Sequence, residues 1–208
     1  MNLQNYMTVR FFGSDSVEIK RSKFIGYAKP VRTQEEAVAF IDEIRRKHRD
    51  ARHNCYAYVL RDCQQKRYSD DGEPQGTAGM PILDVILKSE LTDVCVVVTR
   101  YFGGILLGTG GLVRAYTEAS QLALQKATPV MMTRCHLVST TIDYSLYGMV
   151  ENLMREYETI EQGIDFTDSV TLNFAIDKTK FNSFAEAFTD IVAGKVSLNI
   201  IGTKYIAI

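Results

Sequence analysis

The sequence has 208 residues, which allows one large domain or two small ones. Its 46% hydrophobic and 24% charged residues are ordinary for a packed globular chain, and they exclude intrinsic disorder, collagen-like repeats and a disulfide scaffold. Because 24 basic side chains are balanced by 25 acidic ones, the net charge argues against a generic nucleic-acid coat protein, whose affinity comes mainly from excess cation on phosphate. A local basic patch is compatible with this balance.

The cysteines and the apolar runs favour a reducing, aqueous compartment. No two cysteines have the CxxC spacing of zinc ribbons or thioredoxin-like sites, so we expect free, mostly buried thiols. They are Cys55, Cys63, Cys95 and Cys135. The N-terminus lacks the apolar stretch of a signal peptide, and the longest apolar runs, 94–98 and 103–107, are far shorter than the roughly 20 residues that span a bilayer. We therefore expect a cytoplasmic protein without membrane segments.

The first part of the chain predicts a β-rich unit with helices layered on one side. Alternating residues predict a β-hairpin within the first 30 residues, and Thr33 with Glu36 forms a capping box at the start of a helix over 34–48. Further predicted strands cover 55–60, 66–69 and 94–99, and further helices begin at Pro81 and cover 111–126. This pattern indicates an α+β domain over residues 1–128.

Residues 129–208 predict a compact βαββαβ series. The predicted strands cover 131–141, 159–166, 169–176 and 197–206; one helix follows Asp143 as its N-cap and a second ends at Gly194. This order is that of the ferredoxin-like split βαβ arrangement. The first domain has 18 basic and 15 acidic side chains and the second has 6 and 10, giving net charges of +3 and −4. We therefore expect an anionic partner to meet the first domain.

A glycine-dense loop between a buried strand and a helix is the strongest local motif. Five glycines within nine residues let backbone N–H groups approach a ligand, and the free N–H groups at the start of the next helix favour an anion. These glycines are Gly103, Gly104, Gly108, Gly110 and Gly111. Arg100 and Arg114 would add bidentate contacts to a phosphate or carboxylate. The alternative is structural: the glycines allow tight strand-to-helix packing and the arginines are simply exposed.

A second motif is acidic and lies in the turn-rich segment 69–81. Asp70, Asp71 and Glu73 offer the oxygen ligands that a hard cation such as magnesium prefers. A long turn made of Asp, Gly and Pro explains the same residues more simply, because acids close in sequence need not converge. We therefore expect no metal site and no cofactor.

Two histidines, a cysteine and clustered basic residues lie between the first predicted helix and the next strand. His48 or His53 would deprotonate Cys55 in a Cys/His nucleophile, but a small buried thiol at the start of a strand is the simpler explanation. The same segment carries a basic stretch whose charge suits the C-terminal end of a helix. Its members are Arg45, Arg46, Lys47, Arg49 and Arg52.

Three segments together resemble the signature blocks of one protein family. They are HRDARHNCYAYVL (48–60), YSDDGEPQGTAGMPIL (68–83) and VVVTRYFGGILLGTGGLVRAY (96–116). They resemble the IMPACT family, whose bacterial members also carry a small second domain similar to residues 129–208. The resemblance implies a first domain with the fold shared by the second domain of a small-subunit ribosomal protein and by the GHMP kinases. It also implies a ferredoxin-like second domain similar to a domain of elongation factor G.

For bacterial members of this family the resemblance suggests a role in translation regulation. Eukaryotic relatives restrain a translation-factor kinase with an additional N-terminal domain, and this sequence is expected to lack that domain and its regulatory circuit. The leading hypothesis is a non-enzymatic cytoplasmic protein that binds RNA, the ribosome or a translation-associated protein. The basic stretch, Arg100, Arg114 and the glycine loop would form one anion-binding surface. The sequence carries no signal specific for DNA.

The competing hypothesis is a phosphate-handling enzyme. The glycine loop would hold the phosphate, Asp70, Asp71 and Glu73 would position a metal, and His53 would act as acid or base. This alternative requires all of these groups to converge on one concave pocket.

Overall fold

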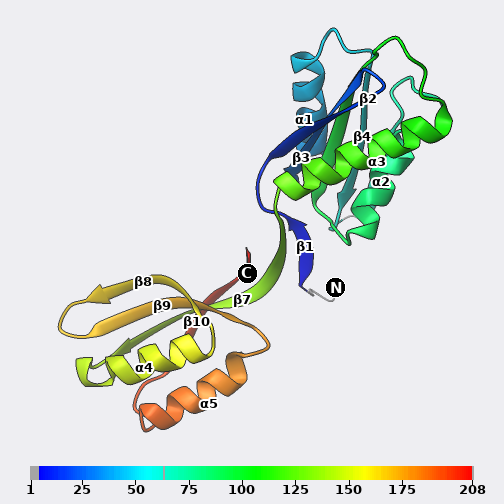
Figure 1. The fold of residues 1–208 in the computed structure, drawn as a ribbon. Coiled ribbons are helices and arrows are strands. Elements are labelled where there is room, and N and C mark those ends of the chain that lie inside the picture. Colours follow the sequence, from blue (N-terminus) through cyan, green and yellow to red (C-terminus); the bar gives the residue numbers. More distant parts are fainter. Residues whose placement is uncertain (1–4, 63, 208) are drawn as a thin grey trace. The chain divides into compact units, whose positions relative to one another are not determined.

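A computed structural model describes residues 5–62 and 64–207 of the chain. In these residues the fold is mixed α+β, with five helices and two antiparallel sheets (Figure 1). The chain divides into two compact units, one of residues 6–131 and one of residues 132–207 together with Asn5. The division lies close to Pro129, where the sequence pattern changes.

The first unit is built on a sheet of five strands in the order β2-β3-β6-β4-β5, and every neighbouring pair is antiparallel. The strands are β2 (Gly13–Ile19), β3 (Ser22–Pro30), β4 (His53–Leu60), β5 (Gln65–Ser69) and β6 (Val94–Tyr101). A short β1 (Tyr6–Val9) precedes them and forms a parallel bridge from Met7 to Leu91. The predicted hairpin is confirmed as β2 and β3, and the strand predicted over 94–99 is the central β6.

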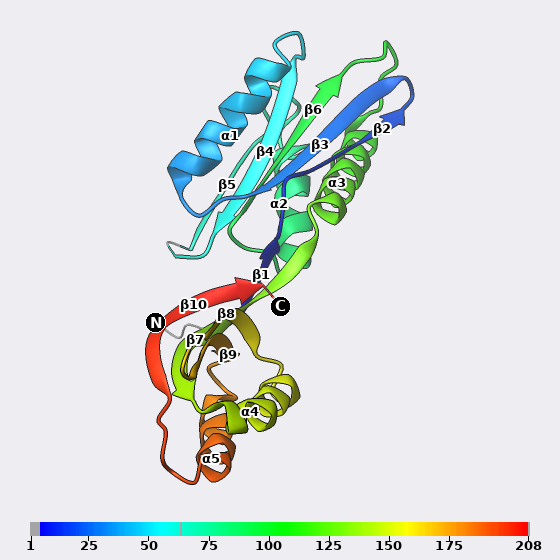
Figure 2. The ribbon, with the colours of Figure 1, turned by 90° about the vertical axis from the view of Figure 1, so that its left-hand side faces the viewer.

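Helices cover both faces of this sheet, so the prediction of helices on one side is wrong. The helices are α1 (Gln34–Lys47), α2 (Gly79–Lys88) and α3 (Thr109–Lys126). α1 packs its apolar stripe against Tyr27, Tyr58 and Val97, whereas α2 and α3 pack on the opposite face (Figure 2). The physical reason lies in β6, whose residues from Val94 to Val98 are fully buried and therefore need cover on both faces.

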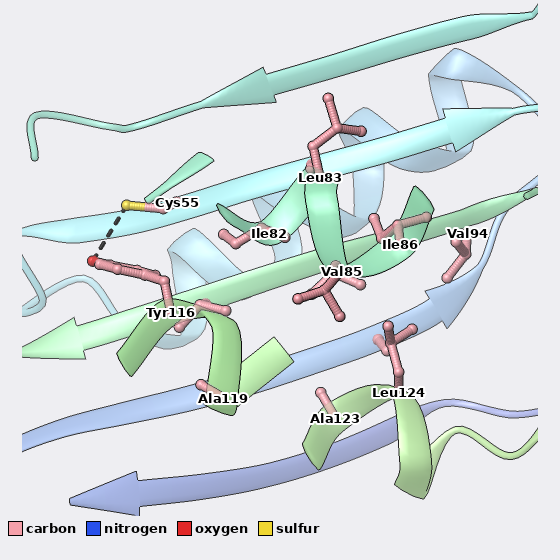
Figure 3. Packing of buried hydrophobic residues seen from close by; sticks show 14 of the residues in the cluster. Cys55, Ile82, Leu83, Val85, Ile86, Val94, Tyr116, Ala119, Ala123 and Leu124 are labelled. Carbon is pink, nitrogen blue, oxygen red and sulfur yellow. Dashed lines mark hydrogen bonds between the residues drawn. The ribbon is translucent and has the colours of Figure 1, made fainter. Parts of the chain in front are cut away.

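The helix boundaries follow local signals. The capping box forms, since the Thr33 hydroxyl accepts a hydrogen bond from the backbone N–H of Glu36, while the Glu36 carboxylate accepts from the N–H of Arg32. α3 begins at Thr109, two residues before the predicted start, with Gly108 at the N-cap in a left-handed conformation (φ 72°). On the α2/α3 face, small residues of α3 such as Ala119 and Ala123 let this helix pack closely against the sheet (Figure 3).

The second unit has the predicted βαββαβ order. Its elements are β7 (Pro129–Ile142), α4 (Tyr144–Glu156), β8 (Ile160–Phe166), β9 (Val170–Asp177), α5 (Phe181–Ile191) and β10 (Asn199–Ala207). The strands pair in the order β10-β7-β9-β8, all antiparallel. Asp143 is at the N-cap of α4 as predicted, but its side chain makes no capping hydrogen bond, so the helix start is not fixed in the expected way.

Three cysteines, Cys55, Cys95 and Cys135, are free and buried, as predicted. Cys63 lies outside the described residues. In the described part of the chain, every helix is too short or too polar to cross a bilayer.

Candidate functional site

Three loops meet at the end of the first sheet where β6 stops. Lys23 of β3 is paired with Tyr101 of β6, and Arg100 is paired with His53 at the start of β4. The Gly103 N–H donates to the Ser22 hydroxyl at 3.1 Å, which ties the glycine loop to the β2–β3 turn. These contacts bring the turn after β2, the loop after α1 and the loop after β6 to one place.

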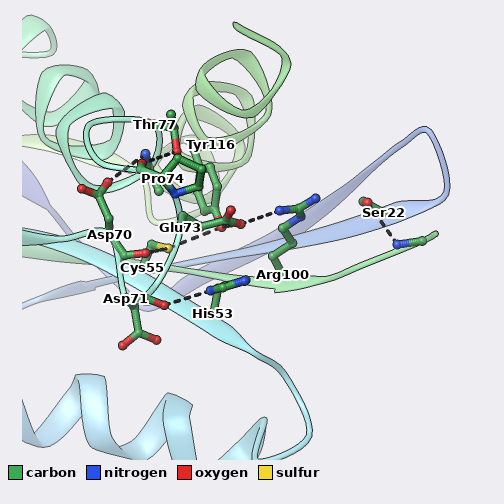
Figure 4. Close-up of polar contacts among 12 residues, drawn as sticks. Ser22, His53, Cys55, Asp70, Asp71, Glu73, Pro74, Thr77, Arg100 and Tyr116 are labelled. Carbon is green, nitrogen blue, oxygen red and sulfur yellow. Dashed lines mark hydrogen bonds and ion pairs between the residues drawn. The ribbon is translucent and has the colours of Figure 1, made fainter. Parts of the chain in front are cut away.

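The acidic segment lies beside these loops, and its first carboxylate is used within the fold. Asp70 accepts hydrogen bonds from the backbone N–H groups of Gly76, Ala78 and Gly79 at 2.8–3.0 Å. Two of these donors belong to the start of α2, whose N-cap residue has no side-chain acceptor of its own. Asp70 therefore acts as a remote cap for α2 (Figure 4).

Asp71 is also fully engaged. One oxygen accepts from the Arg45 guanidinium at 2.9 Å and the other from the backbone N–H of Asn54 at 2.7 Å. Its backbone carbonyl oxygen is 2.9 Å from Nδ1 of His53. These contacts hold the predicted acid or base, His53, against the loop backbone, and they occupy Arg45, whose guanidinium also lies over the Tyr56 ring.

Glu73 and Arg100 form a buried ion pair. Glu73 is 8% exposed and Arg100 is 7% exposed, and their Oε1 and Nη1 atoms are 2.6 Å apart. The Tyr116 hydroxyl donates to the same Glu73 oxygen at 2.8 Å. The prediction that Arg100 presents its guanidinium to a ligand is therefore not supported by its position, because the charge is compensated inside the unit. The pair, together with the Tyr116 hydroxyl, instead links β6, the acidic loop and α3.

Cys55 is positioned as a buried donor rather than a nucleophile. Its thiol donates to the backbone carbonyl of Asp70 at 2.9 Å and lies 3.4 Å from the Tyr116 hydroxyl. Burial raises the pKa of the Cys55 thiol far above its ordinary value, and the nearby carboxylates add to this effect. Burial likewise raises the pKa of Tyr116. A thiolate is disfavoured here, so the Cys/His hypothesis has no support in the geometry.

His48 lies on the other face of the sheet and takes part in a hydrogen-bonded chain. Its Nε2 is 2.6 Å from the Tyr27 hydroxyl and its Nδ1 is 2.8 Å from the Tyr101 hydroxyl, which itself donates to Asp50. Since the Tyr101 proton goes to Asp50, Nδ1 carries the imidazole proton and Nε2 accepts from Tyr27. Burial lowers the pKa of His48, and the Lys47 charge adds to this. A neutral His48 therefore fixes Tyr101 at the junction of the loops.

The glycine loop combines a fixed start with an open tip. A Cβ at Gly103 would overlap the backbone of Arg21, so only glycine fits there. Gly104 and Gly108 have φ values of 84° and 72°, and added Cβ atoms at these positions or at Gly110 would meet nothing within 4 Å. A Cβ at Gly111 would lie 3.0 Å from the Leu107 side chain. Three of the five predicted glycines thus lie where the backbone can be approached from outside.

The exposed cations around this junction come from the β2–β3 turn and from the loop after α1, and we call them the basic rim. The basic rim consists of Lys20, Arg21, Lys23, Lys47, Arg49 and Arg52. Two acids accompany it, Asp50, which accepts from Tyr101, and Glu18, which is paired with Lys23 across the hairpin. Arg46 is exposed on α1 and donates to a carbonyl of its own helix, as does Arg114 on α3.

Sequence reasoning identified half of the basic rim and missed the other half. Lys47, Arg49 and Arg52 are part of the predicted basic stretch, whereas Lys20, Arg21 and Lys23 were assigned only to a hairpin. Their position next to the glycine loop depends on the pairing of β3 with β6, which no local pattern reveals. One feature of the sequence could have drawn attention to this turn, because two basic residues stand where a tight hairpin turn favours Asn and Gly. In the structure Lys20 and Arg21 take left-handed φ values of 49° and 65°.

Within residues 5–62 and 64–207, no three His, Cys, Asp or Glu side chains are grouped so that they could hold a metal ion. The carboxylates of the three acids in segment 69–81 each accept hydrogen bonds from other groups of the protein. The arrangement is therefore a positively charged surface supported by a rigid polar layer beneath it.

Comparisons with known proteins agree with the motifs in these loops. The profile of the Impact N-terminal domain matches residues 20–124, half of the chain, and that of a domain of unknown function (DUF1949) matches residues 140–195. The IMPACT family member YvyE of Bacillus subtilis is 39% identical over 93% of this chain and 89% of its own length. The protein belongs to the IMPACT family. The family member YigZ of Escherichia coli is 37% identical over 87% of this chain and 90% of its own length.

Relatives outside bacteria share only part of this IMPACT family chain. Protein IMPACT of Xenopus laevis is 31% identical over 45% of the chain and 31% of its own length. A crystal structure of a hypothetical protein matches with a TM-score of 0.61 and 34% identity, over 96% of this chain and 98% of that one. The two-unit organisation is thus found in another protein of solved structure.

Proposed function

We propose that this IMPACT family protein is a non-enzymatic cytoplasmic binding protein that contacts the RNA phosphate backbone through the basic rim and acts on the translation machinery. The observation that supports this most directly is the gathering of six exposed cations from the β2–β3 turn and the loop after α1 near Tyr101. Only two acids accompany them, so the local charge is strongly positive although the whole chain is near neutral. Phosphate neutralisation supplies most of the affinity of such a surface.

The internal contacts of the acidic loop favour binding over the phosphate-handling enzyme. Each carboxylate that would position a metal already accepts hydrogen bonds from the protein, and His53 is held by the backbone of Asp71. A general acid or base must reach a proton on a bound substrate. The cations of the basic rim, in contrast, are exposed where a ligand can reach them.

The turn between β2 and β3 gives independent support. Non-glycine residues in the left-handed region cost about 1 kcal/mol or more each, and such residues are often retained for function. Lys20 and Arg21 both occupy this region at the edge of the basic rim. Their presence at a turn that favours Asn-Gly is consistent with a role for their charges.

The finer fold assignments belong to the same proposal. The strand order β10-β7-β9-β8 supports a ferredoxin-like second domain over 129–208. We assign residues 1–128 to a domain with the fold of the ribosomal-protein and GHMP-kinase domains, on the family resemblance. Superposition of an experimental structure of this chain on proteins of both folds tests these assignments.

Fluorescence anisotropy with labelled RNA over a series of salt concentrations tests the function. We expect the double variant Arg49→Ala/Arg52→Ala to weaken binding at low salt and to reduce the slope of log K against log salt by about 2, one for each phosphate that is no longer neutralised. The matched control is Lys66→Ala/Arg67→Ala, which removes two exposed cations from β5, and Lys66 is paired with Val59 far from the rim.

Equal loss of affinity in both double variants would show that RNA responds to net charge alone and would contradict the site. No binding of wild-type protein to RNA or to ribosomes would contradict the function itself. Co-sedimentation with ribosomes, with and without RNase treatment, separates binding to RNA from binding to a translation-associated protein.

A further inference from the structure

One aromatic ring next to the basic rim is half exposed and rests against a buried guanidinium. The Arg100 guanidinium lies 5.5 Å from the ring centroid of Phe24 and 5.5 Å from that of Phe102. Phe24 is fully buried, Arg100 is 7% exposed and Phe102 is 52% exposed. Arg100 therefore contacts a buried ring and a half-exposed ring, and Phe102 is the one that a ligand can reach.

The groups next to the Phe102 ring are themselves held in place. Arg100 cannot move away because Glu73 binds it at 2.6 Å and Tyr116 binds Glu73. The backbone on either side of Phe102 is fixed by the pairing of Tyr101 with Lys23 and by the hydrogen bond from Gly103 to Ser22. A ring carried on such a fixed backbone loses less entropy on binding than one on a mobile loop.

The surroundings of Phe102 specify the chemistry of that ligand. The residue after Phe102, Gly103, approaches the backbone of Arg21, so the β2–β3 turn with Lys20 and Arg21 borders Phe102. The other cations of the basic rim adjoin Tyr101 on the opposite face of β6, across the end of the sheet. A flat apolar ring bordered by cations is complementary to a nucleotide, which has a flat base and an anionic phosphate. Bases stacked within a duplex do not offer a free face, whereas unpaired bases do.

We propose that Phe102 is a stacking platform for an unpaired base of single-stranded RNA, whose phosphates lie along the basic rim. This inference rests on the proposed function and adds the class of RNA and the contact that selects it. Every base has a π-face, so the stacking gives preference for unpaired strands and little preference for sequence.

The chain offers a specific spectroscopic test because it contains no tryptophan. Phe102→Trp places a single tryptophan at the platform, and we expect its fluorescence to be quenched when oligouridylate or a mixed-sequence single strand is added. The matched control is Phe11→Trp. Phe11 is 58% exposed and has the Arg10 guanidinium 5.5 Å from its ring centroid, but it precedes β2 at the end of the hairpin opposite to the rim. Its fluorescence is expected to stay unchanged.

The affinity test uses wild type and Phe102→Ala with a single-stranded RNA and a blunt duplex of equal phosphate number. Loss of one base stack lowers affinity for the single strand roughly 5- to 100-fold and leaves the salt slope and the duplex affinity unchanged. Phe102→Tyr is expected to retain wild-type affinity.

Equal effects of Phe102→Ala on single strand and duplex, or quenching in neither tryptophan variant while RNA still binds, would overturn the stacking platform and leave the proposed function intact. Preferred binding of an acidic peptide over RNA, with Phe102→Ala weakening the peptide, would also overturn it. Absence of any RNA binding by the wild type would instead overturn the proposed function.

Discussion

The acidic segment 69–81 and the glycine loop after β6 are the two most conspicuous loops in the sequence, but the fold uses them in opposite ways. The carboxylates of Asp70, Asp71 and Glu73 all accept hydrogen bonds from the protein itself. The glycine loop is fixed at its start by Gly103 and near its end by Leu107, which packs on the core, and between them it exposes Leu106 by 82%. Phe102, just before Gly103, is half exposed. The difference teaches that a charged motif can be a structural support, while the surface open to a ligand lies in the less charged loop next to it.

The sharpest way to test this contrast is to remove the carboxylate of Glu73. Glu73→Ala leaves the Arg100 charge buried without its partner, and we expect the free energy of unfolding to fall by about 3–5 kcal/mol. Urea unfolding followed by circular dichroism measures this change. The control Glu118→Ala removes an exposed carboxylate from α3 and should change stability by less than about 0.5 kcal/mol.

The double variant Glu73→Leu/Arg100→Met separates a structural pair from a functional one. Because it removes both charges together, we expect it to recover much of the stability lost in Glu73→Ala. If Glu73→Ala were as stable as the wild type, the acidic loop would have to be regarded as a surface like the glycine loop.

The turn before β3 tests the other side of the comparison. Replacing Lys20 and Arg21 by Asn and Gly supplies the residues that their left-handed conformation favours, so we expect stability to rise by about 1 kcal/mol. RNA affinity should fall at the same time, and the salt slope should decrease by about 2. A gain in stability without a loss of affinity would remove this turn from the basic rim.

A smaller effect is expected from His48, which links the loop after α1 to Tyr101. Burial lowers its pKa, so the folded protein binds a proton there less readily than the unfolded chain, where the histidine pKa is about 6.5. Its contribution to stability is complete above about pH 6.5 and is lost as the pH falls through the folded pKa. We expect acidification from pH 7 to 5 to destabilise the wild type more than His48→Gln.

Urea unfolding at the two pH values checks this difference. Burial lowers the pKa of His136 as well, but that residue is present in both proteins and its effect cancels. Parallel loss of stability in wild type and His48→Gln would contradict the role given to His48.

Local patterns predicted most of the fold. The capping box at Thr33 and the β-branched run from Val94 act within a few residues of themselves, so their consequences are visible in the sequence. The position of α1 on the opposite face of the sheet from α2 and α3 was missed, because it depends on which strands become neighbours.

The candidate site was predicted only in part for the same reason. Arg100 and Arg114 are similar in sequence context, but pairing with Glu73 buries the first while the second stays exposed on α3. Lys23 becomes a neighbour of Tyr101 through a pairing that spans 78 positions of the chain. Long-range contacts of this kind decide which charges are available, and residue types alone do not report them.

The close approach of Gly103 to the backbone of Arg21 restricts the register in which β6 can pair with β3. A slip of β6 by one residue along β3 would bring Phe102 or Gly104 to the place where no Cβ fits, and it would turn Lys23 and Tyr101 to opposite faces. Phe102 cannot occupy that place at all. The contact therefore excludes the slip that would bring Phe102 to this place. The opposite slip would bring Gly104 there, and it is opposed by the reversal of side-chain faces along the strand.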